Sequence, residues 1–306
     1  IEDVCRLSIA EMIRGGTTCF NDHYFFPNEL ANTAISEGMR ACIGHVIMNV
    51  PTGWAKDENE YISKAKSALA EAPNHPLITW SIAPQGPYTN SDTSLQAAKT
   101  LAEEHDYIMH MHVHETLDEI NIDLKNHGKR PMKRLFDLGL LTPKFLAVHM
   151  VHLNDEEIAM VKETGVQISH CPESNMKLAS GLARISDLLA EGINVSIGTD
   201  GACSNNDLDM FGELRTASFM AKIQNADPTS IPALEALKMA TFNGAKALGL
   251  DHEIGSLEAG KAADVIAVNL GSYLTQPIYN PASQLVYAAN RLQVSDVWIA
   301  GKHLLA

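Results

Sequence analysis

Residues 107–115 read YIMHMHVHE, an apolar segment that ends in histidines and a glutamate. Successive side chains of a strand point to opposite faces, so His110, His112 and His114 share one face if the strand is regular. Three imidazoles that point into a packed interior are costly unless something binds them. The stretch therefore predicts a strand whose end carries a functional site.

Six further short apolar segments alternate with helix-like segments, which makes seven strand–helix units in all. This alternation predicts a parallel sheet. The strands are apolar throughout, as expected when helices cover both faces of the sheet. The seven strand candidates lie at 17–26, 41–50, 77–84, 107–115, 144–152, 166–172 and 194–201.

These units predict an α/β fold, a (β/α)8 TIM barrel, which needs eight units and about 250 residues. The chain holds seven units, starts at Ile1, and already has a helical pattern over residues 1–16. We therefore expect the first strand of the barrel to precede Ile1. An open doubly wound sheet is the alternative, and it is less favoured because no GxGxxG turn follows any strand.

The end of the chain has a different character. We expect residues 1–250 to form the barrel, incomplete at its N-terminus, and residues 251–306 to be the C-terminal strands of a small β domain. Short strands are predicted at 263–270 and 295–306. So few short strands cannot fold alone, which favours the remnant of a β-sandwich domain that needs partner strands.

Composition narrows the class of protein. The chain has 306 residues, of which 45% are hydrophobic, and a formal net charge of −14. The negative charge disfavours a nucleic-acid surface, and no run of about 18 apolar residues predicts a membrane span. The five cysteines form no CxxC pair, and we expect no secretory signal. We expect a cytoplasmic protein with a small-molecule substrate.

Polar groups gather at the predicted strand ends, where TIM barrels hold their catalytic residues. His112 and Glu115 form an H-x-x-E pattern. The imidazole can bind a cation while the carboxylate, just past the strand, reaches a bound water or a substrate. We expect His110 and His114 to be supporting or surface residues.

Two later strand ends complete the set. His149 ends AVHMVH and can act as an acid or polarise a water. Asp200 follows an apolar strand between two glycines and can bind a metal and take a proton from its water. The alternative for Asp200 is a helix N-cap. Catalytic zinc uses about three protein ligands, so His112 and Asp200 leave a deficit that matches the missing first strand.

Several long motifs resemble one known family. HMHVHET, AVHMVHL, SHCPESNMKLASG, SIGTDGACSNNDLDMFGELR and GSLEAGKAADVIAV resemble the amidohydrolase superfamily. Within it they look like the 5-methylthioadenosine/S-adenosylhomocysteine deaminases and their chlorohydrolase relatives. The resemblance covers essentially the whole chain.

The resemblance implies a single divalent metal, usually Zn²⁺, held by an H-x-H pair, a fifth-strand histidine and an eighth-strand aspartate. His112 and Asp200 match the last two ligands, and the H-x-H pair has no match. Glu115 matches the glutamate that shuttles protons. His149 matches the histidine that orients the attacking hydroxide.

Three positions are implied to contact the substrate: Gln85, Glu115 and Ser204. Ser204 matches a position after the eighth strand, and Glu115 also contacts the substrate. Gln85 stands in APQGPYT where family members often have histidine. Glutamine can donate and accept hydrogen bonds but carries no charge, so this position bears on substrate preference.

The implied activity is hydrolytic deamination at C6 of adenine in S-adenosylhomocysteine, 5-methylthioadenosine or adenosine, with release of ammonia. One alternative keeps the site and changes the substrate to guanine, cytosine or an s-triazine. Another is a non-catalytic barrel that serves as a scaffold. A homo-oligomer is compatible with each of these.

Overall fold

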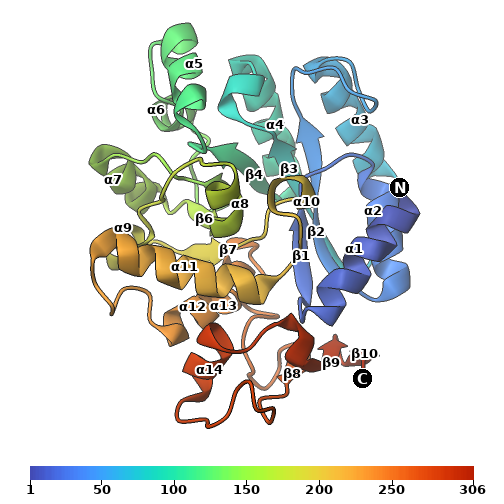
Figure 1. Ribbon diagram of the computed structural model, residues 1–306. Helices are drawn as coiled ribbons and strands as arrows, with labels where there is room; N and C mark the ends of the chain where they lie inside the picture. The colour runs from blue at the N-terminus through green and yellow to red at the C-terminus, as the bar shows by residue number, and fades with distance from the viewer. The chain divides into compact units, whose positions relative to one another are not determined.

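The computed structural model describes all residues from 1 to 306 (Figure 1). The chain divides into two compact units. The first comprises Ile1–Arg6 and Cys19–Ile168, and the second comprises Leu7–Thr18 and Ser169–Ala306. Helix α1 (Glu2–Arg14) contributes residues to both.

Five parallel strands form the sheet of the first unit, and each pairs with the next along the chain. The register places Asn21 beside Cys42, and Val113 beside His149. Every residue of β2 is buried, which agrees with a sheet covered on both faces. The strands are β1 (Cys19–Asp22), β2 (Arg40–Ile47), β3 (Ile78–Pro84), β4 (Ile108–Val113) and β5 (Phe145–His149).

Helices follow these strands along the chain, and side-chain caps fix where several of them begin. Ser91 caps α4, Thr116 caps α5, and Asn154 forms a capping box with Glu157 at α7. The helices of this unit are α2 (Pro27–Glu37), α3 (Glu58–Ala70), η1 (Pro87–Thr89), α4 (Asp92–His105), α5 (Leu117–His127), α6 (Pro131–Asp137) and α7 (Asp155–Thr164).

Strands and helices also alternate along the chain in the second unit. Strand β6 (Gln167–His170) ends in it, β7 (Val195–Ile197) follows, and the Gly198 N–H donates to the His170 carbonyl at 2.9 Å. Its helices are α8 (Pro172–Lys177), α9 (Ile185–Ala190), α10 (Ala202–Asn205), α11 (Met210–Asn225), α12 (Ala233–Met239), α13 (Phe242–Ala247), α14 (Pro281–Tyr287) and η2 (Arg291–Gln293).

A small antiparallel sheet closes the chain in the order β10-β9-β8. It consists of β8 (Val265–Val268), β9 (Val294–Ile299) and β10 (Lys302–Leu305). The strand predicted at 263–270 is confirmed as β8, and the stretch predicted as one strand at 295–306 forms two paired strands, β9 and β10. The domain boundary at residue 250 stays a prediction.

The predicted α/β class with seven strands in chain order is confirmed. The strand ends differ from the prediction. The strand predicted at 17–26 is shorter and comprises only β1. No helix is both long and apolar enough to cross a lipid bilayer.

Candidate active site

Three residues predicted to carry the chemistry come together in the first unit. His112 lies on β4 and His149 ends β5, and their rings stack with centroids 5.5 Å apart. Glu115 follows β4, and its Oε2 lies 3.7 Å from Nε2 of His149. The parallel register produces this meeting, because adjacent strands end at the same edge of the sheet.

The hydrogen bond of His112 fixes its tautomer. Its Nδ1 lies 2.8 Å from the backbone oxygen of Gln85. A carbonyl only accepts, so Nδ1 carries the proton and Nε2 carries the lone pair. Metal-binding histidines are held in this manner, with one ring nitrogen donating to a carbonyl or carboxylate. The ring of His112 therefore fits a nitrogen ligand for a cation.

Gln85 lies immediately after β3, as predicted, and its side chain is oriented by its neighbours. Its Oε1 accepts a hydrogen bond from Oγ1 of Thr89 at 2.7 Å. The Tyr88 hydroxyl also bonds to the Gln85 side chain, and burial, with Glu119 and Glu115 nearby, raises the pKa of Tyr88. Sequence reasoning assigned no role to Tyr88, because an aromatic residue in a proline turn carries no signal of its own.

His23 is a second residue without a predicted role. Its ring centroid lies 4.6 Å from that of His112 and 4.8 Å from that of His110. Both of its ring nitrogens are buried without a hydrogen-bond partner. Burial, with His112 and His110 nearby, holds the pKa of His23 well below its usual range. A neutral imidazole has a lone pair to offer, which a charged one lacks.

The other two histidines of β4 and its end have supporting contacts. His110 accepts a hydrogen bond from the Asn21 amide at 2.9 Å, and burial lowers the pKa of His110 to about 3. His114 is fully buried, accepts from the Met132 N–H at 3.3 Å, and lies 3.6 Å from Glu157. Both agree with the supporting role expected for them.

The backbone is strained at the ends of several strands. His114, His149, Met150 and Asp200 have φ values of 57°, 74°, 51° and 62°. Residues other than glycine seldom adopt this left-handed region, and such strain gathers at functional sites. The conformation turns the chain sharply where the strands end.

In the second unit, Asp200 follows β7 and is held by two donors. Its Oδ2 accepts from Oγ of Ser174 at 2.6 Å, and its Oδ1 accepts from the Gly201 N–H at 2.6 Å. The helix that follows has Gly201 as its N-cap, with no side-chain cap. The alternative interpretation of Asp200 as the N-cap is therefore wrong. Ser204 lies within this short helix α10.

A buried glutamate secures the loops around Asp200. Glu213 of α11 accepts from the backbone N–H of Glu173 at 3.2 Å and from the Asn205 amide. The same amide of Asn205 donates to the Thr199 carbonyl at 2.9 Å. Burial raises the pKa of Glu213 to about 8. The sequence offered no signal for this residue, because an acidic residue in a helix usually faces solvent.

Two of the predicted metal ligands carry atoms that a divalent metal binds. His112 offers an imidazole nitrogen and Asp200 offers carboxylate oxygens, both suited to zinc. No group of three His, Cys, Asp or Glu side chains is arranged to hold an ion. Each side chain suits zinc by its own chemistry, and the role of His112 and Asp200 as metal ligands stays a prediction.

Comparison with known proteins gives a consistent picture. The chain matches the model of the amidohydrolase family over residues 1–304. The 5-methylthioadenosine/S-adenosylhomocysteine deaminase of Teredinibacter turnerae is 45% identical over 305 residues, covering 100% of this chain and 69% of the relative.

Solved structures agree over nearly the whole chain. An adenosine deaminase from Xanthomonas campestris with bound zinc matches with a TM-score of 0.97 and 46% identity, covering 99% of this chain and 69% of that one. The atrazine chlorohydrolase of Arthrobacter aurescens complexed with zinc matches with a TM-score of 0.90 and 26% identity, covering 99% and 72%.

Proposed function

Because the chain belongs to the amidohydrolase family, we propose that it is a metal-dependent deaminase that hydrolyses the C6 amino group of an adenine nucleoside. The family resemblance and the enzyme class predicted from the sequence are both confirmed. The observation that carries the proposal is the meeting of His112, Glu115 and His149 at one edge of the sheet. A scaffold protein would not need a carboxylate, a strained histidine and a tautomer-fixed imidazole together.

The substrate class follows from the relatives. One is named for methylthioadenosine and S-adenosylhomocysteine, and a solved structure is named an adenosine deaminase. We propose that this chain acts on the same 6-aminopurine nucleosides. Its identity to these proteins is well above its 26% identity to the atrazine chlorohydrolase, which makes an s-triazine substrate the second candidate.

We propose Zn²⁺ as the metal, with His112 and Asp200 among its ligands. A bound divalent cation lowers the pKa of a water so that hydroxide is available at neutral pH. The zinc-bound neighbours support this choice of ion.

The protein's own side chains would move the protons. Asp200 would accept a proton from the attacking water, and Nε2 of His149 would hold the oxygen of that water in place by a hydrogen bond. The Glu115 carboxyl delivers a proton to the purine ring nitrogen beside C6. A C–O bond would form at C6, and the C–N bond would break as Asp200 passes the water's proton to the amino group, which leaves as ammonia. The proton of the new C6 hydroxyl would return to Glu115, so that both carboxyl groups regain their starting states. Glutamate plays a comparable role, without binding the metal, in zinc deaminases of another fold.

The free cysteines support a cytoplasmic location, which we include in the proposal. None of the five cysteines is in a disulfide, and Cys42 and Cys171 are buried. Disulfide-free cysteines are typical of reducing compartments.

A substrate panel tests the proposed function. Zinc-loaded protein is mixed in turn with methylthioadenosine, S-adenosylhomocysteine, adenosine and atrazine, and ultraviolet absorbance is recorded. A change from an adenine-like to a hypoxanthine-like spectrum with any nucleoside supports the proposal and ranks the 5′ substituents. Turnover of atrazine alone would contradict it and favour the second candidate.

A further inference from the structure

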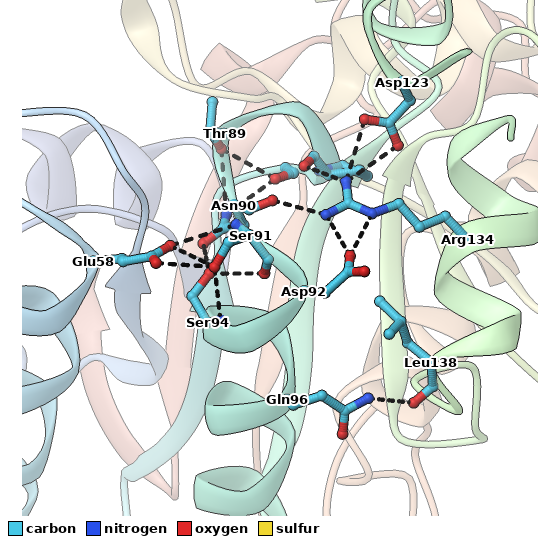
Figure 2. Close-up of polar contacts among 12 residues, drawn as sticks. Glu58, Thr89, Asn90, Ser91, Asp92, Ser94, Gln96, Asp123, Arg134 and Leu138 are labelled. Carbon is cyan, nitrogen blue, oxygen red and sulfur yellow. Dashed lines mark hydrogen bonds and ion pairs between the residues drawn. The ribbon is translucent and has the colours of Figure 1, made fainter. Parts of the chain in front are cut away.

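Arg134 of α6 is a buried arginine with 3% of its surface exposed, and its guanidinium contacts two carbonyls and two carboxylates. Nη1 donates to the Pro87 carbonyl at 2.8 Å, and Nη2 donates to the Asn90 carbonyl at 2.9 Å. Figure 2 shows the guanidinium between Asp92 and Asp123, which it meets at 2.8 and 3.2 Å. One side chain thus binds both ends of the turn η1.

The short connection between β3 and this turn carries the carbonyl that fixes the tautomer of the candidate metal ligand. Gln85, two residues before Pro87, accepts from both the Nδ1–H and the backbone N–H of His112, at 2.8 and 3.2 Å. Its own N–H donates to the Ile47 carbonyl at 3.0 Å. The position of the Gln85 carbonyl therefore decides which nitrogen of His112 carries the proton.

Internal hydrogen bonds connect Gln85 and Gly86 to the far end of this loop. The Asn90 amide donates to the Gly86 carbonyl at 3.0 Å, and the Thr89 hydroxyl donates to Oε1 of Gln85 at 2.7 Å. At its far end Ser91 donates to Glu58 at 2.9 Å, as Figure 2 shows. A displacement at Pro87 or Asn90 is therefore transmitted to Gln85.

The burial of Arg134 is not explained by a gain in folding stability. Burying an ion pair such as Arg134–Asp123 costs desolvation that the attraction often only offsets. Burial raises the pKa of Asp123, although Arg134 partly opposes that rise. A guanidinium does provide fixed geometry, because its planar fork holds several acceptors at set positions.

We propose that Arg134 is a positioning residue that holds the Gln85 carbonyl in place and so keeps His112 in the tautomer able to bind a metal through Nε2. The inference rests on the proposed function in taking His112 as a metal ligand. The tautomer itself does not depend on which substrate the enzyme uses.

The test is the Arg134→Met variant, observed by long-range ¹H–¹⁵N imidazole spectra of metal-free protein and by zinc affinity in competition with a chelator. The His112→Gln spectrum assigns the signals. We expect His112 to be protonated at Nδ1 in the wild type and to become a mixture of tautomers in Arg134→Met. Zinc affinity falls about tenfold, as for other residues that orient metal ligands. Arg134→Lys gives an intermediate result, because an ammonium cannot span both carbonyls.

Arg215→Met is the matched control. Arg215, in the second unit, also donates to two backbone carbonyls, those of Val286 and Ala289. Its loss lowers the unfolding temperature but leaves the His112 tautomer and the zinc affinity unchanged. If Arg134→Met behaves in the same way as this control, Arg134 is structural only and the inference is wrong. A tautomer change in a protein that deaminates none of the nucleosides would overturn the proposed function and leave the inference standing.

Discussion

Two glutamates four residues apart have opposite surroundings. Glu119 is buried, its carboxylate accepts the backbone N–H groups of His114 and Glu115 at 2.9 Å each, and burial raises its pKa to about 7. The Glu115 side chain is 25% exposed and lies beside His149. Glu119 therefore shapes the loop, and Glu115 is the more exposed carboxyl of the two. The role of Glu115 stays a prediction from the sequence, and nothing in the sequence distinguished Glu119 from a solvated helix residue.

Ser174 provides a test of how Asp200 is held. We expect Ser174→Ala to lower zinc affinity about tenfold, because the 2.6 Å hydrogen bond that orients Oδ2 of Asp200 is lost. Chelator competition measures this. Ser186→Ala is the control, since the Ser186 hydroxyl is buried in the same unit without a partner. Equal zinc affinity in the two variants would show that the Ser174 contact has no such role.

The elements follow the sequence pattern in type and order but not in length. Apolar runs and helical periodicity predicted the strands, because burial on both faces requires apolar residues along their length. The pattern failed at strand ends, where polar site residues replace apolar ones and the backbone leaves the extended region. His23 illustrates this, since it falls within the predicted strand at 17–26 and lies just past β1.

Close packing between strands gives a second prediction. A Cβ added to Gly44 of β2 would lie 2.7 Å from the Asp22 carbonyl and 2.9 Å from Cβ of Ala83. Both atoms belong to or are fixed by the backbone, so Gly44→Ala should lower the free energy of unfolding by about 1–3 kcal/mol. Thermal denaturation tests this, with Gly53→Ala as control because nothing lies within 4 Å of that position. Equal unfolding temperatures for the two variants would contradict this, because they would show that the neighbouring strands accommodate the added Cβ without loss of stability.

At the scale of the whole molecule, the fold class and family could be predicted because they depend on a pattern repeated along the chain. Contacts between residues far apart in the sequence could not be predicted. The neighbours of His23, and the reach of Arg134 to residues 47 and 44 positions away in sequence, depend on register and helix placement. No local signal encodes them.

Buried titratable groups predict a stability maximum near neutral pH. Burial lowers the pKa of five histidines below 6.5, so their contribution to stability is complete above pH 6.5 and is lost as the pH falls toward their folded values. Three buried carboxyls have raised pKa values of about 6, 7 and 8, so their contribution is complete at low pH and is lost as the pH rises through those values. The histidines are His23, His45, His110, His114 and His170, and the carboxyls are Asp22, Glu119 and Glu213.

Unfolding temperatures of metal-free protein between pH 5 and pH 9 test this balance. We expect a maximum at about pH 7 with a steeper loss on the acid side, where more groups titrate. A stability that keeps rising from pH 7 to pH 9 would contradict it.

The central claim is that Glu115 moves the proton in a metal-dependent deamination. The most direct measurement is the rate of ammonia release from methylthioadenosine by zinc-loaded wild type and by Glu115→Gln at equal zinc content. We predict that the wild type releases ammonia and that the variant retains its zinc but is slower by about 10²–10⁴-fold, the usual contribution of general acid–base catalysis. Ammonia release by the variant at the wild-type rate would contradict the account.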